Sequence, residues 1–149
     1  MILDAVVAAA LAVILGWAAW IDFKRMILPD WLTLPLIPAG LALAWAQEQP
    51  LPERVIGAVA GYAAFAGIAW IYRRWRGRDG LGLGDAKLLA AAGAWTGWAS
   101  LPSVVLVGSV TALAWVLVAR PDPQKPFPFG PFLAAGFWLV WKFGPLTLG

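Results

Sequence analysis

Residues 2–21 read ILDAVVAAALAVILGWAAWI, an apolar run with a single charged side chain, Asp4. A transmembrane helix needs about 20 mostly apolar residues, so this run predicts one. Over the whole chain, 62% of the 149 residues are hydrophobic and 13% are charged, with a mean hydropathy of +0.77. A soluble domain carries about 25% charged residues, and a core this small cannot bury the apolar excess. The composition therefore indicates one integral membrane domain, residues 1–149.

Further apolar runs predict five more helices, so we expect an all-α polytopic bundle of about six transmembrane helices. The fourth and sixth runs are short for a full span of about 20 residues. The first run contains an acid, Asp4, near its start, and no basic residue precedes it. It therefore does not resemble a signal peptide and is expected to stay as a helix. The five further runs are approximately Trp31–Ala46, Val55–Tyr72, Ala86–Ala99, Ser103–Ala119 and Phe132–Phe143.

Basic residues gather in alternate connections between these runs. The positive-inside rule then puts the first, third and fifth connections in the cytoplasm, and both termini outside, in a multi-pass protein of the cell inner membrane. The second connection holds both signs of charge, and the fourth holds none. The basic residues are Lys24 and Arg25; Arg73, Arg74, Arg76, Arg78 and Lys87; and Arg120 and Lys125.

The chain contains no cysteine and no histidine. This composition excludes disulfides, thiolate metal sites and catalysis by Ser-His or Cys-His pairs. Catalysis would have to use carboxylates, lysine, tyrosine or hydroxyl groups. We expect no metal or cofactor, and membrane lipid rather than nucleic acid as a partner.

Two acids lie at the expected cytoplasmic edge of the membrane, where a carboxylate is costly and marks a candidate functional site. Asp22 follows the first apolar run, and Asp85 precedes the fourth. Two carboxyl groups on one side of the membrane can form a pair that shares a proton. The alternatives are that Asp22 forms a solvated pair with Lys24 or Arg25, and that Asp85 is the N-cap of its helix.

The helix ends suggest a role for each acid. Asp22 lies at a helix C-terminus, where the macrodipole and partial burial both favour the protonated form. Asp85 lies at a helix N-terminus, which favours the ionised form. The first hypothesis is therefore that Asp22 polarises a carbonyl and Asp85 activates water.

Several neighbouring residues are candidates for supporting roles. Gly82 and Gly84 would let a substrate backbone approach Asp85 closely. Lys87 either tunes Asp85 or extends toward the membrane surface. Asp30 is expected to be an N-cap in preference to a substrate contact, and Asp79 either pairs with an arginine or lies beside the site.

Residues 120–131 read RPDPQKPFPFGP and predict a stiff, non-helical connection because prolines are so dense. Pro131 fits the first turn of the last helix. The apolar tip, Phe127 and Phe129, is expected either to rest on the membrane or to line an entrance.

Three motifs occur in order along the chain: Asp22 followed by Leu28-Pro29-Asp30, then Gly82-Leu83-Gly84-Asp85-Ala86-Lys87, then Pro128-Phe129-Gly130-Pro131. Together they resemble the type IV prepilin peptidases, membrane aspartic proteases of the GxGD kind. The resemblance implies that Asp22 and Asp85 are the catalytic pair. It also implies supporting roles for Gly82, Gly84, Lys87, Asp30, Asp79, Pro128, Phe129 and Gly130.

The resemblance further implies substrates that are prepilins or pseudopilins, each with a basic leader followed by an apolar helix. Cleavage would follow a glycine, at the cytoplasmic face, without a metal ion. Long members of that family carry paired Cys-x-x-Cys motifs linked to N-methylation. Because this chain lacks cysteine, it resembles the short form, which includes enzymes of Flp-type pili, and we expect no methyltransferase activity. Asp79 stands where we expect Glu, which keeps the charge.

Two other classes of function stay open on the sequence. A small proton-coupled transporter could use the acids as a relay, although such acids are expected near the middle of the membrane. A non-catalytic assembly subunit could bind pilins without cutting them, although both acids are intact.

Overall fold

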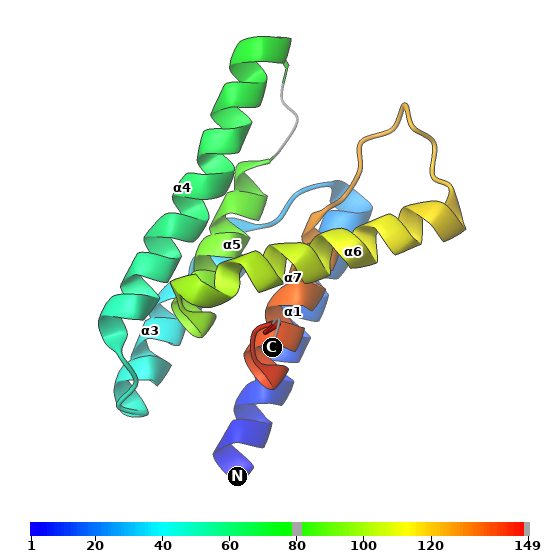
Figure 1. Cartoon of the computed structure of the whole chain (residues 1–149). Coiled ribbons are helices and arrows are strands. Elements are labelled where there is room, and N and C mark those ends of the chain that lie inside the picture. The colour runs from blue at the N-terminus through cyan, green and yellow to red at the C-terminus, as the bar shows by residue number, and fades with distance from the viewer. Residues whose placement is uncertain (79–81, 148–149) are drawn as a thin grey trace.

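The computed structural model describes residues 1–78 and 82–147. In these residues it is all-helical and contains no strand, which confirms the expected fold class. The helices are α1 (Ile2–Arg25), α2 (Asp30–Thr33), α3 (Leu36–Ala46), α4 (Leu51–Arg76), α5 (Leu83–Thr96), the 3-10 helix η1 (Trp98–Ser100), α6 (Leu101–Ala119) and α7 (Gly130–Phe143) (Figure 1).

Each of the six predicted apolar runs corresponds to a helix, but several boundaries differ. The first helix continues past Ile21 to Arg25, so Asp22 lies inside its last turn. The second run divides into α2 and α3 because Pro35 cannot continue a helix through its missing N–H. The fourth run ends at Thr96, ahead of η1.

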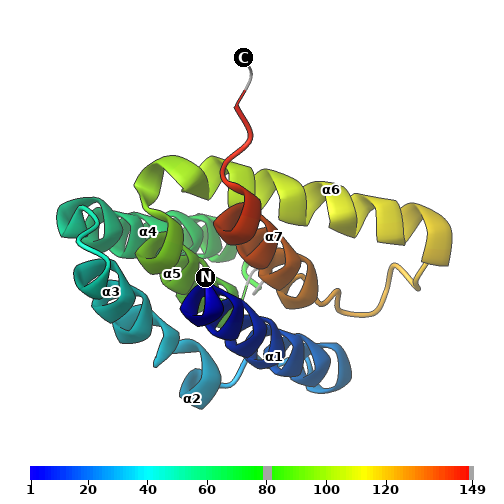
Figure 2. The ribbon, with the colours of Figure 1, turned by 90° about the horizontal axis from the view of Figure 1, so that it is seen from below.

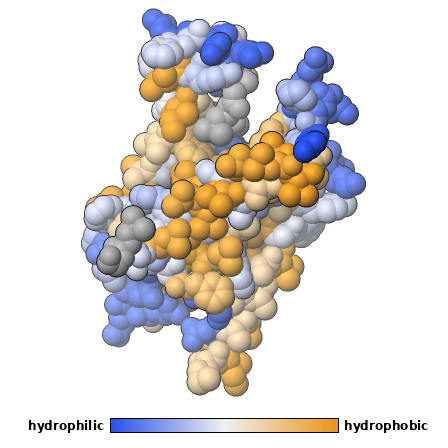
Figure 3. Space-filling model, turned by 45° about the vertical axis from the view of Figure 1, so that its right-hand side comes forward, coloured by the Kyte–Doolittle hydropathy of each residue, from blue (hydrophilic) through white to orange (hydrophobic). Residues whose placement is uncertain are grey.

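Three stretches are long and apolar enough to cross a membrane: Ile2–Arg25, Leu51–Arg76 and Trp98–Ala119. On the face shown in Figure 3, apolar residues form a broad band across the middle, and hydrophilic residues gather at the upper projections and at the lower left. This distribution matches a bilayer, which is apolar in the middle and polar at both surfaces.

Helix α5 lies at the centre of the bundle, between α3 and α4 on one side and α7 on the other (Figure 2). Nearly every residue from Ala86 to Trp95 is buried. With 14 residues, α5 is about 21 Å long, shorter than a hydrocarbon core of about 30 Å. A short helix is tolerated here because protein, and not lipid, surrounds it.

Glycines allow the backbones of α4 and α5 to touch. A Cβ atom at Gly57 would lie 2.5 Å from the carbonyl oxygen of Gly93, and one at Gly61 would lie 2.6 Å from that of Leu89. Small residues at helix contacts permit such close approach in membrane proteins. This contact fixes the height of α5, and therefore of Asp85, against α4.

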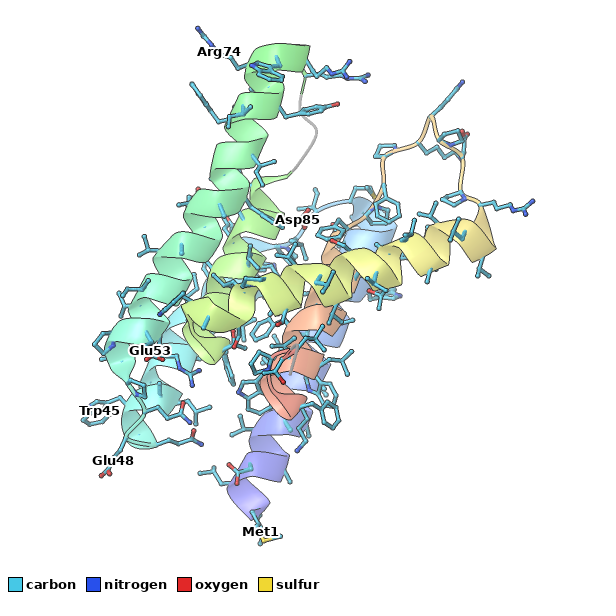
Figure 4. The ribbon with its side chains drawn as sticks, in the orientation of Figure 1. Met1, Trp45, Glu48, Glu53, Arg74 and Asp85 are labelled. Atoms are coloured by element: carbon cyan, nitrogen blue, oxygen red, sulfur yellow. The ribbon has the colours of Figure 1, made fainter. Side chains whose placement is uncertain are left out.

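The two ends of the bundle differ in charge. Arg74 lies at one end of α4, while Glu48 and Met1 lie at the opposite end of the molecule (Figure 4). Asp85 lies between these ends, on the same side of the bundle as the connection that links α6 to α7. The C-terminal end of α1, which carries Asp22, points in the same direction (Figure 1).

Candidate active site

Asp22 is buried near the end of α1, with 6% of its surface exposed. Four residues later Met26 adopts a left-handed conformation, with φ of 58°, and its N–H donates to the Asp22 carbonyl at 2.8 Å. This turn ends the helix in the manner of an αL cap. Lys24 and Arg25 in the same turn are exposed. Because Asp22 itself is buried, the alternative of a solvated carboxylate does not describe it.

Leu28, in the first motif, follows that turn and lies against a glycine from each of the other two motifs. Its side chain is buried, with 6% exposed. A Cβ atom at Gly84 would lie 3.0 Å from Leu28 Cβ, and one at Gly130 would lie 3.0 Å from Leu28 Cδ1. Leu28 was not predicted as a site residue, although its place directly before Pro29 and Asp30 in the first motif was a signal.

Asp85 is the third residue of α5 and is half-buried. The N-cap is Gly82, with no side-chain cap, so the N-cap interpretation of Asp85 is wrong. Asp85 precedes the apolar stretch of its helix. Desolvation on burial, followed by the charge of Asp22, raises the pKa of Asp85 to about 7.

This shift contradicts the expectation that the helix N-terminus keeps Asp85 ionised. The dipole of a helix end contributes about 0.3–1 kcal/mol at the surface, whereas removal of a carboxylate from water costs more. Burial therefore outweighs the dipole, and Asp85 holds a proton in acidic solution.

Both acids line one cavity of about 850 Å³. It opens between the Arg74 end of α4 and the connection from α6 to α7, where the molecular surface is hollowed (Figure 3). Of the predicted residues it also includes Asp30, Gly82, Gly84, Pro128 and Phe129, together with Phe127, so the tip of the proline-rich connection lies at the cavity. The other lining residues are Met26, Ile27, Leu28, Tyr72, Arg78, Pro123, Gln124, Lys125 and Pro126.

Asp30 forms an ion pair with Lys87, whose Nζ lies 2.8 Å from Asp30 Oδ1. The N-cap of α2 is Pro29, and Asp30 is the first helical residue, so the N-cap prediction for Asp30 is wrong. The ion pair could not be predicted from the sequence, because Lys87 lies 57 residues away from Asp30. Asp79 lies outside the described residues.

Gly130 begins α7 against Asp22. Its backbone amide hydrogen-bonds the Asp22 carboxylate. Pro131 occupies the first turn of α7, as predicted. Within residues 1–78 and 82–147, no group of three or more His, Cys, Asp or Glu residues gathers where it could hold a metal ion.

The cavity can therefore support acid–base chemistry by two carboxyl groups. One ionised and one protonated carboxyl can deprotonate water and protonate a carbonyl oxygen in the same step.

Comparisons with known proteins relate this chain to one family. Residues 9–117 match the type IV leader peptidase family. The chain is 50% identical over 121 residues to a prepilin leader peptidase/N-methyltransferase of Burkholderia pseudomallei, which covers 78% of this chain and 39% of that protein. It is 41% identical over 142 residues to a protein of the same name from Aeromonas salmonicida, covering 89% and 49%.

The chain thus spans less than half the length of these curated relatives. No solved structure matches the chain. The matched residues include Asp22 and Asp85 and most of the bundle. The match confirms the family resemblance that the three motifs indicated. The chain belongs to the type IV leader peptidase family.

Proposed function

We propose that this protein is an aspartic endopeptidase that removes the leader of type IV prepilin-like proteins after a glycine. The observation that carries the proposal is the shared cavity of Asp22 and Asp85. The names of the two relatives add support for prepilins as substrates. Flp-type pilins are the finer expectation within that class. Residues 1–149 would act as one transmembrane peptidase domain.

The charge distribution supports an orientation in which the cavity faces the cytoplasm. The basic end of α4 and Lys125 lie at the end of the bundle where the cavity opens, and positive residues favour the cytoplasmic side. The protein would then be a multi-pass inner-membrane protein with both termini outside.

Lipid is the expected partner of the outer surface. Large apolar side chains on α1, α4 and α6 are exposed, among them Val13, Val59 and Leu117 at 68%, 65% and 66%. Such a surface is costly in water and suits acyl chains. Nucleic acid is not expected as a partner.

The test is co-expression with a candidate prepilin from the same genome. Leader loss is followed by gel shift for the wild type, Asp22→Asn and Asp85→Asn. Asp4→Asn is the matched control, because Asp4 is an exposed acid in the first turn of α1, where it pairs with the N-terminus. We expect cleavage by the wild type and the control, and none by the two cavity variants.

Cleavage by all four proteins would show that the two acids are structural. A pilin that co-purifies with the wild type but is never cut would favour the binding subunit. Proton-coupled uptake without cleavage would favour the transporter. Mass spectrometry of the mature N-terminus in the same assay also tests the expectation that no methyl group is added.

A further inference from the structure

The first residue of α7 is in contact with a buried acid from the other end of the sequence. A Cβ atom at Gly130 would overlap Asp22 Oδ2 and lie 3.0 Å from Asp22 Cγ, so only glycine fits at this position. The Gly130 amide hydrogen-bonds the Asp22 carboxylate. Gly130 is itself buried, as is Asp22.

The first turn of α7 directs a single amide to this contact. The first four residues of a helix have no intrahelical acceptor for their N–H groups. Pro131 has no N–H, and the amides of Phe132 and Leu133 donate to the Phe129 carbonyl at 3.1 and 3.0 Å. In this turn the Gly130 amide is therefore the donor left for Asp22.

The contact opposes the effect of Asp22's own helix. The C-terminal end of α1 disfavours a negative charge, whereas the N-terminal end of α7 favours one. A hydrogen bond from an amide to a carboxylate also favours the ionised form directly. Here it acts against burial, which is the larger effect and favours the protonated form of Asp22. The sequence showed the first effect but not the second.

We propose that Gly130 is a positioning residue, which orients the Asp22 carboxylate and favours its ionised form, so that Asp22 accepts a proton of the attacking water. This assignment rests on the proposed peptidase function and reverses the first hypothesis for the two acids. Water oxygen attacks the scissile carbonyl carbon while Asp22 takes a water proton and Asp85 gives its proton to the carbonyl oxygen.

The resulting gem-diol then collapses. The C–N bond breaks, the leaving nitrogen takes the proton from Asp22, and one hydroxyl returns a proton to Asp85 as the new carboxyl group forms. Asp22 is again ionised and Asp85 again protonated, so the cycle closes with one water consumed.

Other charged or titratable groups face Asp22 across the cavity. They are Asp85 on α5, Asp30 on α2, Tyr72 on α4, Arg78 just beyond α4, and Lys125 in the α6–α7 connection. Lys87 on α5 is the ion-pair partner of Asp30. A change confined to the Gly130 amide leaves all of these groups in place, so its effect on the pH profile isolates this contact.

The test measures kcat/KM for prepilin cleavage against pH. The decisive variant carries glycolic acid in place of Gly130, which exchanges the N–H for an ester oxygen and adds no side chain. It is made by cell-free synthesis into lipid nanodiscs. We expect the acidic limb of the profile to move up by about one pH unit, a tenfold change in proton affinity, while the alkaline limb stays.

Gly130→Ala is the second variant and should lower kcat/KM at least about tenfold, because a displaced catalytic carboxylate is poorly aligned. Gly136→Ala is the matched control. It lies on the same helix, where a Cβ atom would lie 2.5 Å from the Val104 carbonyl oxygen, far along α7 from Asp22. The control should lower stability and leave both limbs unchanged.

The ester variant separates the two possible failures. A wild type that cleaves no prepilin overturns the proposed function. A cleaving wild type whose ester variant keeps both limbs, or moves the alkaline limb instead, overturns the role of Gly130 alone. A movement of the acidic limb in the Gly136→Ala control as well would also overturn it, because the effect would then be structural.

Discussion

The Nζ atom of Lys87 lies 2.8 Å from Oδ1 of Asp30, and this ion pair ties α2 to the first turns of α5, two residues beyond Asp85. The Asp30 side chain is 57% exposed and that of Lys87 is 24% exposed. An exposed pair of this kind contributes about 0–1 kcal/mol to stability. Its effect should therefore be mainly on the placement of Asp85.

Neutralising either partner should lower activity more than stability. We expect Asp30→Asn and Lys87→Met each to reduce kcat/KM for prepilin cleavage about three- to tenfold, because small misalignments of a catalytic group slow the reaction. The free energy of unfolding should change by less than about 1 kcal/mol. The charge-swapped double variant, Asp30→Lys with Lys87→Asp, should recover part of the activity. Full activity in both single variants would show that the pair has no part in positioning.

The close contact between α4 and α5 predicts a large cost for a single methyl group. A Cβ atom at Gly93 would overlap the backbone carbonyl of Gly57, which cannot rotate away. We expect Gly93→Ala to lower the free energy of unfolding by about 1–3 kcal/mol, as overpacking does. Thermal unfolding in detergent would measure the change.

Gly67→Ala is the control for that experiment. Gly67 lies in the same helix as Gly57, but a Cβ atom there has no neighbour within 4 Å. Because alanine is the better helix former, this variant should be neutral or slightly stabilising. Losses of equal size in the two variants would mean that the cost of Gly93→Ala does not come from the interhelical contact.

The six helices were predictable because the apolar runs are long and are separated by prolines, glycines and charges. What the runs do not show is how each helix is surrounded. Helix α5 looks like a short span in the sequence, yet it is the buried centre of the bundle. The division of the second run at Pro35 was readable from the proline but was not predicted.

The site was predictable in part. Asp22 and Asp85 were placed on one side of the membrane by charge alone, and they share a cavity. The partners of each acid were not predictable, because they come from distant segments. Gly130 reaches Asp22, and Asp30 reaches Lys87, only after the helices pack. For Asp85 the expected ionised form was wrong, because burial and the charge of Asp22 outweigh the effect of its own helix end.

Asp85 should make the fold less stable as the pH rises. Burial and the charge of Asp22 raise its pKa from 3.8 to about 7, so between these values the folded state binds more protons than the unfolded state. The stabilisation is complete below about pH 4 and is lost as the pH rises through about 7. Thermal unfolding in detergent across this range should show a falling Tm.

Asp85→Asn should flatten that dependence, since the amide does not titrate. Asp22→Asn should move the fall in Tm to lower pH, because it removes the charge that adds to the burial effect. A Tm that rises with pH in the wild type would contradict the assignment of the proton to Asp85.

The absence of cysteine makes the proposed orientation directly measurable with single-cysteine variants. Gln124 is exposed in the α6–α7 connection, and Gln47 is exposed where α3 ends, toward the opposite end of the bundle. With the cavity in the cytoplasm, a membrane-impermeant maleimide should label Gln47→Cys in intact spheroplasts and Gln124→Cys only after the membrane is opened. The cysteine-free wild type is the control for background labelling. The reverse pattern would place the cavity outside, away from the leader of an unprocessed pilin. Labelling of both variants in intact spheroplasts would mean that the chain between the two positions does not cross the membrane as proposed.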